Sequence, residues 1–340
     1  MIRVWFNKTF SSIHSALELI READKKGKYG LVCSSPNPHA IGPLAAHKAA
    51  VEPGGVTGAE YVDWCLSFCR EEGVDILVPG KEASLLARCE KEFRSHGVRI
   101  LSAAAPETLE LLHDKARFYD TAQAPTAPAP EFAVFRNLRV FDEAYRQMKA
   151  EHDFLCMKPS VSVYGIGFRQ IVEQQTAFSI MLGGDAYRVD LTSLRAMLKQ
   201  AAEFRPMLLM PYLGGHEFSV DCVADNGTLV CGVARRKSRA SGDGQLIVRR
   251  EDIEAACEHL VAQFGLNGNV NIQFREGESG LHVLEINPRM SGGIGMACLA
   301  GPNLPYLALE VFDRGRGSVN IPLISEGLRV GESSRAVRLS

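Results

Sequence analysis

A chain of 340 residues, 46% hydrophobic and 23% charged, is long enough for roughly two or three packed domains. Its formal charge of -2 gives no general attraction to nucleic acid or anionic membranes, and the sequence contains no run of about eighteen apolar residues. The nine cysteines include no Cys-x-x-Cys pair, which argues against a zinc site or a disulfide framework. We therefore expect a cytoplasmic protein that binds neither nucleic acid nor membranes.

The first hundred residues alternate between short apolar runs and amphipathic segments. Strands are predicted at 2–6, 29–33, 75–78 and 98–101, and helices at 11–23, 58–72 and 82–95. This alternation is typical of an open parallel sheet, whose ligands bind beyond the carboxyl ends of the strands. Candidate contacts there are Asn7, Lys8, Ser34, Ser35 and residues 79–82. The alternative is that these residues only form turns and a helix start.

A helix predicted at 106–122 leads into the proline-rich run 124–130, which cannot be regular helix and indicates a domain connection. Beyond it, strands are predicted at 132–135, 154–158, 167–172, 207–212, 217–224 and 229–234, and helices at 141–151, 250–264 and 304–314. The later part is therefore α+β. The expected domains are 1–105, a connection at 106–130, 131–206, and 207–340.

Near the end of the chain, two predicted strands carry oxygen ligands. Residues 281–289 alternate so that Glu285 and Asn287 share one face, and a polar turn joins this strand to 271–274. A hairpin could bring the amide oxygen of Gln273 beside Glu285. Mg²⁺ usually takes one or two protein carboxylates together with substrate phosphates. With Arg289 just beyond the strand, the pattern predicts a magnesium and polyphosphate site.

Two lysines earlier in the chain are candidate phosphate contacts. Lys158 ends an apolar strand, and the small and glycine residues at 159–167 that follow it could surround phosphate oxygens. The same glycines could merely form a hairpin. Lys115 taken alone is typical of a solvated helix face.

Three more segments could contact a nucleotide. The proline in 210–213 leaves strand-end backbone groups that could pair with a purine edge. Glu217 could accept hydrogen bonds from both hydroxyls of a ribose. The alternative is that it is an ordinary glutamate on the exposed face of a strand. The basic run 235–239 is normally a solvated face, but Arg235 or Lys237 could neutralise the charge of a phosphate in transfer.

The order of these elements along the chain resembles that of the ATP-grasp superfamily. The lysines and the small-residue loop come first, the 210–213 strand follows, and the metal motif comes last. The similarity is greatest to the ATP-binding halves of the carbamoyl phosphate synthetase large subunit, and it covers about 114–300. Its most specific part is 271–274 followed by 285–291. The resemblance implies a Rossmann-like N-terminal domain with an open parallel sheet, followed by an ATP-grasp fold of two subdomains, so the chain is α/β and α+β.

The resemblance also implies a role for each candidate residue. Lys115 and Lys158 would contact the phosphates of ATP, under a mobile loop containing Val161, Gly165 and Gly167. The residues implied to contact adenine are Met210, Pro211, Tyr212 and Leu213. Glu217 would contact the ribose, and the metal ligands would be Gln273, Glu285 and Asn287. Arg289 would face the phosphate in transfer and the acyl phosphate that it makes, and residues 291–293 would border the acceptor carboxylate. Together with Arg235 of the basic run, Arg289 and Lys158 are the expected catalytic residues.

The implied activity is that of an ATP-dependent ligase, which forms an acyl phosphate from a small carboxylate and joins it to an amine. Its cofactors would be ATP and one or two Mg²⁺ ions, with Mn²⁺ as a substitute, and it could form a homodimer. Two alternatives are a nucleotide-binding sensor or assembly subunit without turnover, and an enzyme that phosphorylates bicarbonate. Complete carbamoyl phosphate synthesis is not expected, because the chain holds one such unit rather than two.

Overall fold

The computed structural model describes residues 1–10, 12–162, 165–238, 243–333 and 336–339. The chain folds into two compact units, and each is described by itself. Unit 1 consists of Met1–Glu110, His216–Phe274 and Ile286–Ser340, and unit 2 of Leu111–Gly215 and Arg275–Glu285. Within the described ranges, no helix combines the length and the apolar character needed to cross a membrane.

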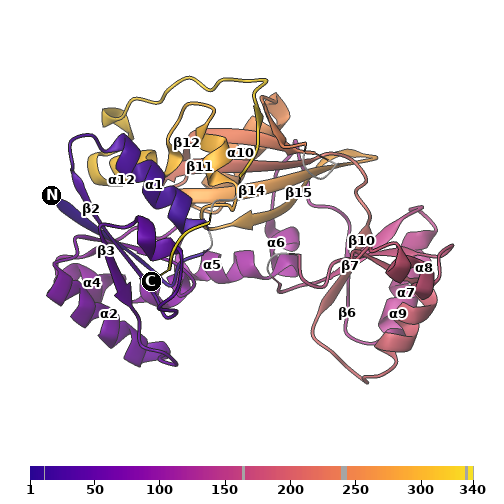
Figure 1. Ribbon diagram of the computed structural model, residues 1–340. Helices are drawn as coiled ribbons and strands as arrows, with labels where there is room; N and C mark the ends of the chain where they lie inside the picture. Colours follow the sequence, from indigo (N-terminus) through magenta and orange to yellow (C-terminus); the bar gives the residue numbers. More distant parts are fainter. Residues whose placement is uncertain (11, 163–164, 239–242, 334–335, 340) are drawn as a thin grey trace. The chain divides into compact units, whose positions relative to one another are not determined.

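The first part of unit 1 is a five-stranded parallel sheet in the order β3-β2-β1-β4-β5. Figure 1 labels its strands β2 and β3. Its strands are β1 (Ile2–Asn7), β2 (Tyr29–Ser35), β3 (Lys48–Val51), β4 (Ile76–Pro79) and β5 (Arg99–Ile100). Its helices are α1 (Ile13–Ala23), α2 (Gly58–Glu72), α3 (Ala83–Arg88) and α4 (Glu90–Ser95). The predicted open parallel sheet is confirmed, although α3 and α4 replace one expected helix.

The two faces of this sheet are covered by different helices, because alternate residues of a strand point to opposite sides. Val4 and Phe6 of β1 pack in one cluster with Leu17 of α1, and Trp5 packs in another with Tyr61 of α2. Both helices bury an apolar stripe, as amphipathic helices do. This packing holds the carboxyl ends of β1 and β4 in place.

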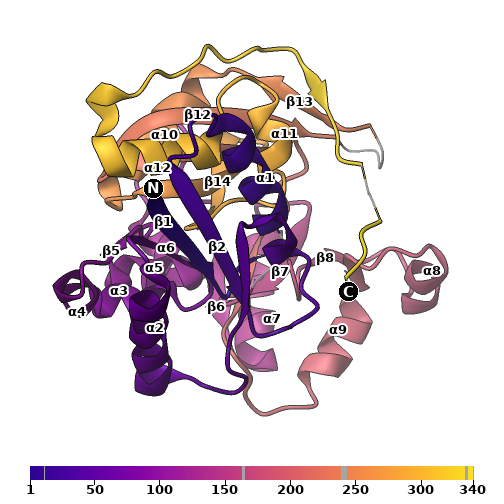
Figure 2. The same cartoon turned by 60° about the vertical axis from the view of Figure 1, so that its left-hand side comes forward.

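The second sheet has the order β15-β14-β11-β12-β13-β16. Figure 2 labels its strands β12, β13 and β14. Its strands are β11 (Glu217–Asp225), β12 (Thr228–Lys237), β13 (Gln245–Val248), β14 (Gly268–Gly277), β15 (Gly280–Asn287) and β16 (Arg329–Val330). The far ends of β14 and β15, residues 275–285, belong to unit 2. The predicted turn between β11 and β12 is confirmed, with positive φ angles of 44° at Asn226 and 86° at Gly227, as a type I′ hairpin requires.

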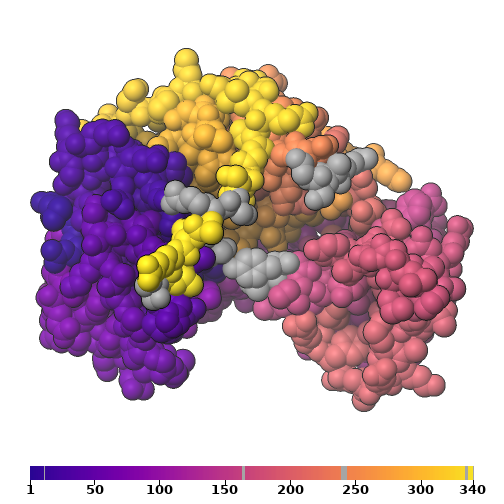
Figure 3. Space-filling view, viewed as in Figure 1, coloured from indigo at the N-terminus to yellow at the C-terminus, as the bar shows by residue number. Residues whose placement is uncertain are grey.

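Helices of unit 1 cover this second sheet. They are α10 (Glu251–Gln263), α11 (Ile294–Cys298) and α12 (Leu304–Arg314). Helix α10 packs against β12, and α12 packs against β11 and also against α1. The chain after α12 runs over the surface of unit 1, where it appears in yellow in Figure 3, and its Leu323 side chain is 93% exposed.

Unit 2 contains the sheet β6-β10-β7-β8-β9, in which β10 pairs antiparallel with both β6 and β7. Its strands are β6 (Ala133–Phe135), β7 (Leu155–Pro159), β8 (Arg169–Val172), β9 (Arg188–Asp190) and β10 (Met207–Pro211). Its helices include α7 (Leu138–Lys149), α8 (Ala177–Leu182) and α9 (Leu191–Leu198). Strand β10 thus lies in the sheet of this unit, whereas the expected boundary at 207 separates it from β6 and β7.

The single helix expected over 106–122 is wrong, because the chain breaks at Asp114 into α5 (Pro106–His113) and α6 (Lys115–Thr121). Asp114 has an extended backbone, with φ -100° and ψ 104°, and its side chain accepts from the backbone N–H groups of Ala116 and Arg117. An aspartate in this position caps the start of a new helix. The break therefore makes Lys115 the first residue of α6.

Candidate functional site

The predicted metal motif lies on the neighbouring strands β14 and β15. Glu285 and Asn287 are two residues apart on β15, so their side chains leave the strand on the same side. Gln273 lies on β14, and all three side chains are half-buried. One carboxylate and two amide oxygens are the kind of ligands that hard cations such as Mg²⁺ take.

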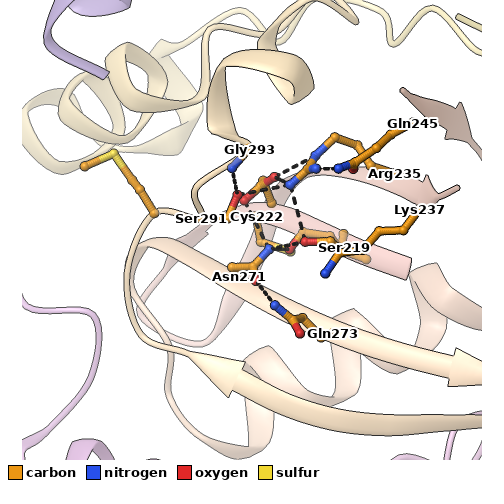
Figure 4. A network of polar contacts seen from close by, with 12 residues as sticks. Ser219, Cys222, Arg235, Lys237, Gln245, Asn271, Gln273, Ser291 and Gly293 are labelled. Carbon is orange, nitrogen blue, oxygen red and sulfur yellow. Dashed lines mark hydrogen bonds and ion pairs between the residues drawn. The ribbon is translucent and has the colours of Figure 1, made fainter. Parts of the chain in front are cut away.

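A buried asparagine orients the amide of Gln273. Asn271 Nδ2 donates to Val220 O and to Asp221 Oδ1, both at 3.1 Å. Because a carbonyl and a carboxylate only accept hydrogen bonds, the nitrogen of Asn271 must face them and its oxygen must face away. Asn271 Oδ1 accepts from Gln273 Nε2 at 3.2 Å, so the carbonyl oxygen of Gln273 points out of this network (Figure 4). The hydrogen bond to Asn271 therefore determines which atom of the Gln273 amide faces away from this network.

Arg235 lies buried in the same network, with 2% of its surface exposed (Figure 4). Its Nε and Nη2 donate to Asp221 Oδ2 at 3.1 and 2.7 Å, and Nη2 also donates to Ser291 Oγ at 3.0 Å. Its Nη1 donates to Gln245 Oε1. These contacts hold the Arg235 guanidinium in a buried ion pair with Asp221. A cation that neutralises a phosphate has to be accessible to that phosphate. The guanidinium instead supports the segment that begins at Ser291.

The carboxylate predicted to meet a ribose is already paired with a lysine. Lys237 Nζ lies against Glu217 Oε1, and the two residues project from the adjacent strands β12 and β11. Both side chains are partly exposed, at 36% for Lys237 and 22% for Glu217. A partly exposed ion pair contributes little to stability, so its members can exchange partners when a ligand binds.

Gly293 is closely packed against Arg235. A Cβ atom at Gly293 would lie 2.5 Å from Arg235 Nη1, whereas a Cβ at the neighbouring Gly292 would meet nothing within 4 Å. Ser291 Oγ accepts from Gly293 N at 3.1 Å and completes the contact between this segment and the buried arginine. The loop that would border an acceptor carboxylate is therefore fixed by Arg235.

We expect Gly293→Ala to destabilise the protein by about 1–3 kcal/mol, because the added methyl must displace the buried guanidinium. Gly292→Ala is the matched control and should change the free energy of unfolding by less than about 0.5 kcal/mol. Urea unfolding of both variants measures the difference. Equal effects of the two substitutions would contradict the packing described here.

Unit 2 buries the first of the two lysines predicted to meet phosphate. Lys115 is 8% exposed, so its interpretation as part of a solvated helix face is wrong. Its Nζ lies 3.6 Å from Glu285 Oε2. Lys158 Nζ donates to the Tyr119 hydroxyl at 2.7 Å, and this hydroxyl donates to Leu284 O at 2.8 Å. Helix α6 therefore brings Lys115 and Tyr119, one turn apart, to strand β15.

The pKa of the Lys115 ammonium lies below its ordinary value of 10.5, mainly because the group is buried. The negative charge of Glu285 offsets part of this shift, and the positive charge of Lys158 adds to it. We expect the affinity for ATP to weaken as the pH rises through this lowered pKa, because the ammonium then loses its charge. The half-saturating ATP concentration measured from about pH 7 to about pH 10 would show the rise.

An arginine keeps its charge over this pH range, so Lys115→Arg should abolish the alkaline loss of affinity. The exposed Lys199 provides a matched control, and Lys199→Arg should keep the profile of the unchanged protein. An alkaline rise of the same size in Lys115→Arg would show that another group is responsible.

The loop after Lys158 is anchored where it begins. Ser160 O accepts from the backbone N–H of Lys115 at 2.9 Å. Gly165 and Gly167 have φ angles of 67° and 86°, which favour glycine, and Val161 is 55% exposed. Some predicted residues lie outside the described ones, namely Val163 and Tyr164 of this loop and Arg239 of the basic run.

The segment predicted to meet adenine begins with the last two residues of β10, Met210 and Pro211. Met210 is buried, with 2% exposure, while Pro211 and Tyr212 are half-buried. The Tyr212 N–H donates to Phe154 O at 2.8 Å, so this donor is already used within unit 2. A ligand that bound here by backbone hydrogen bonds would have to use other groups of the segment.

No pattern in the sequence points to Glu52, the buried carboxylate at the carboxyl end of the parallel sheet. Glu52 is 2% exposed and accepts from Ser34 Oγ and the Tyr61 hydroxyl, both at 2.8 Å, and from Lys8 N at 2.7 Å. Asn7 Nδ2 donates to the same tyrosine hydroxyl at 3.1 Å. Asn7 and Ser34 therefore hold this end of the sheet together.

Comparison with known proteins relates the chain to ATP-grasp enzymes. A family model described as "ATP-grasp in the biosynthetic pathway with Ter operon" matches residues 203–336. A carbamoyl phosphate synthase large chain from Clostridium perfringens (strain SM101 / Type A) is 34% identical over 130 residues. This match covers 33% of the present chain and 12% of the Clostridium chain, so the present chain corresponds to a small part of that relative.

Solved structures with low sequence identity share the fold. N5-carboxyaminoimidazole synthetase from Staphylococcus aureus, complexed with ADP, has a TM-score of 0.62 and 12% identity, covering 91% of this chain and 76% of that one. An L-amino acid ligase from Bacillus licheniformis has a TM-score of 0.61 and 13% identity, covering 92% and 74%. At these identities the likeness shows a common fold.

Proposed function

Because the chain has the ATP-grasp fold and shares sequence with carbamoyl phosphate synthase large chains, we propose that it is an ATP-dependent ligase that releases ADP. In the first step, a carboxylate oxygen of the substrate attacks the γ-phosphorus of ATP, the bond to ADP breaks, and an acyl phosphate forms. In the second, an amine attacks the acyl carbon, phosphate leaves, and the nitrogen loses a proton. The observation that carries this proposal is the oriented set of Gln273, Glu285 and Asn287 followed by Arg289.

The residues of this set fit Mg²⁺. Glu285 supplies the negative charge, and the amides of Gln273 and Asn287 supply neutral oxygens, which leaves the remaining positions for water and phosphate oxygens. The network around Asn271 turns the Gln273 oxygen outward, as a ligand must be turned. Bound magnesium would supply positive charge to the transferred phosphoryl group, and Mn²⁺ accepts the same oxygen ligands.

Each unit holds some of the residues that we expect to contact the nucleotide. Unit 2 contributes the ammonium groups of Lys115 and Lys158, which are already arranged around Glu285 and Tyr119 and suit phosphate oxygens. Its segment 210–213 would contact adenine. Unit 1 contributes Glu217, which would bind the ribose hydroxyls on leaving Lys237.

Arg289 is the residue that we propose to face the transferred phosphate. Its guanidinium lies over the Phe10 ring, 4.6 Å from the centroid, and its Nη1 donates to Met290 O at 3.1 Å. These contacts orient a planar group that can hold two oxygens of a phosphate or a carboxylate at once. Arg235 is a positioning residue in this scheme and acts through Ser291.

The loop containing Val161, Gly165 and Gly167 would close over the phosphates. Exclusion of water matters here, because an acyl phosphate hydrolyses easily. Gly165 and Gly167 have positive φ angles of 67° and 86°, a backbone conformation that glycine adopts readily and other residues rarely do. No nucleophilic side chain of the protein is required.

A hydroxylamine screen tests the proposal without knowledge of the amine. The protein is incubated with ATP, magnesium, hydroxylamine and single carboxylic acids, and ADP and hydroxamate are both measured. Acid-dependent ADP release with an equal amount of hydroxamate is expected. Release with bicarbonate alone would favour the bicarbonate-phosphorylating alternative, and ATP binding without ADP release under any condition would favour a sensor or assembly subunit.

A further inference from the structure

Unit 1 contains a cavity of about 60 Å³ at the carboxyl ends of β1 and β4, beside the end of β15. The crevice beyond the carboxyl ends of parallel strands is where ligands of open α/β sheets bind. Most of the lining is apolar and comes from α1, α3 and α12 as well as the strand ends, for example Phe10, Ile13, Ala83, Ala103, Met290 and Leu309. Arg289 also lines the cavity.

Besides Arg289, the polar side chains of the lining are Thr9, Ser12, Asn267 and Asn269, and the amides of both asparagines donate to the protein backbone. Asn267 Nδ2 donates to Ser102 O at 3.3 Å, and Asn269 Nδ2 donates to Leu304 O at 3.1 Å. Among the residues that the structure describes, no carboxylate lines the cavity. A second charged group inside the cavity would lose its hydration and meet only a few polar side chains in return, whereas burying an apolar group there carries no such cost.

Arg289 gives the cavity one charged wall. Its guanidinium is held over Phe10, which lines the same cavity, so the cation lies directly beside an apolar surface. A molecule that combines a carboxylate with an aliphatic chain matches both parts. We propose that the cavity binds the aliphatic side chain of the carboxylate substrate while its carboxylate lies at Arg289, an inference that rests on the ligase function proposed above.

The volume limits the length of this side chain. One water needs on the order of 10–15 Å³ of such space, so a cavity of about 60 Å³ holds about four water-sized groups. A chain of about four carbons beyond the carboxyl group fills it. The substrate class is therefore a monocarboxylic acid with a short aliphatic chain, as opposed to a dicarboxylic or long-chain acid.

A series of straight-chain acids from acetate to octanoate, with succinate as a charged comparison, tests this inference in the ADP-release assay. The half-saturating concentration should fall about twofold to fourfold for each added methylene up to pentanoate, since each buried methylene is worth up to about fourfold in binding. It should rise again for octanoate. A flat profile, or a preference for succinate, would overturn the inference.

Two substitutions on α3 locate the effect. Ala83 lines the cavity and Ala87, one turn later on the same helix, does not. Ala83→Leu should raise the half-saturating concentration of pentanoate at least tenfold and leave that of acetate nearly unchanged, while Ala87→Leu should change neither. If Ala83→Leu does not fold, Ala103→Val fills the same cavity by a smaller amount. Identical profiles of the cavity-filling and control variants would overturn the inference.

A binding measurement separates this inference from the proposed reaction. Calorimetric titration of pentanoate into the unchanged protein and Ala83→Leu, without ATP, reports on the cavity alone. If no acid supports ADP release but pentanoate binds and Ala83→Leu abolishes its binding, the cavity assignment holds and the ligase function fails. If ADP release depends on an acid but Ala83→Leu does not alter the binding of pentanoate, the ligase function holds and the cavity assignment fails.

Discussion

Glu285→Gln should reduce the rate of ATP consumption by about 100-fold or more. Glu285 is the only charged member of the proposed metal ligands, because Gln273 and Asn287 supply neutral amides. It also lies 3.6 Å from the buried ammonium of Lys115, so its loss removes charge from both the metal and this lysine. The half-saturating magnesium concentration should rise together with the fall in rate, and titrating magnesium in the ADP-release assay measures both.

Glu278→Gln is the control for this prediction, because Glu278 lies in the exposed turn of the same hairpin. It should keep the rate of the unchanged protein. Asn287→Ala removes a neutral ligand and should cost activity in the same direction as Glu285→Gln. If Glu285→Gln and Asn287→Ala both left ATP consumption unchanged, the assignment of the metal site would be wrong.

Arg235→Ala should lower the free energy of unfolding by about 3–5 kcal/mol, the usual effect of leaving a buried charge without its partner. Asp221, which is 1% exposed, loses two hydrogen bonds from the guanidinium and gains none. Urea unfolding followed by circular dichroism gives the change. The neighbouring Arg236→Ala should cost less than about 0.5 kcal/mol, because Arg236 is not part of this ion pair.

The double substitution Arg235→Met with Asp221→Leu distinguishes a broken pair from a general loss of packing. Removing both charges should destabilise the protein much less than Arg235→Ala alone, since no buried charge is left unpaired. Arg235→Lys separates the positioning role from a direct role at phosphate. A folded Arg235→Lys variant with normal stability and no activity would show that the guanidinium contacts the substrate.

Much of the fold could be predicted because its elements carry local signals. The helices expected at 58–72 and 304–314 are α2 and α12 with the same bounds, since both have an amphipathic pattern. The hairpin at 226–227 followed from a turn sequence that requires positive φ angles. The alternating pattern of β14 and β15 likewise indicated paired strands.

The elements that were missed have no such signal. Strand β3 is a short, mostly exposed edge strand of Lys-Ala-Ala-Val, so it shows neither an apolar run nor alternation. Helix α8 exposes most of its residues and α9 exposes half of its residues, and each has only one buried side chain. The break between α5 and α6 depends on Asp114. In the sequence alone, an aspartate that caps a new helix looks the same as one in the interior of an exposed helix.

The candidate site residues came from their spacing and from the family resemblance, and their roles stay predictions. Spacing along the chain could not give the partners of these residues. Asp221, Arg235 and Asn271 lie on three strands and meet only because β12, β11 and β14 are neighbours in the sheet. The burial of Lys115 has the same origin, because it depends on packing against residues far away in the sequence.

A carboxylic acid labelled with ¹⁸O in its carboxyl group tests the central claim most directly. The acid that supports the fastest ADP release is used together with ATP, magnesium and an accepted amine. If the carboxylate attacks the γ-phosphorus and the amine then displaces phosphate, one labelled oxygen passes from the acid to each inorganic phosphate. Mass spectrometry of the phosphate should therefore find one ¹⁸O atom per turnover. Phosphate without the label would contradict an acyl phosphate intermediate and with it the ligase mechanism.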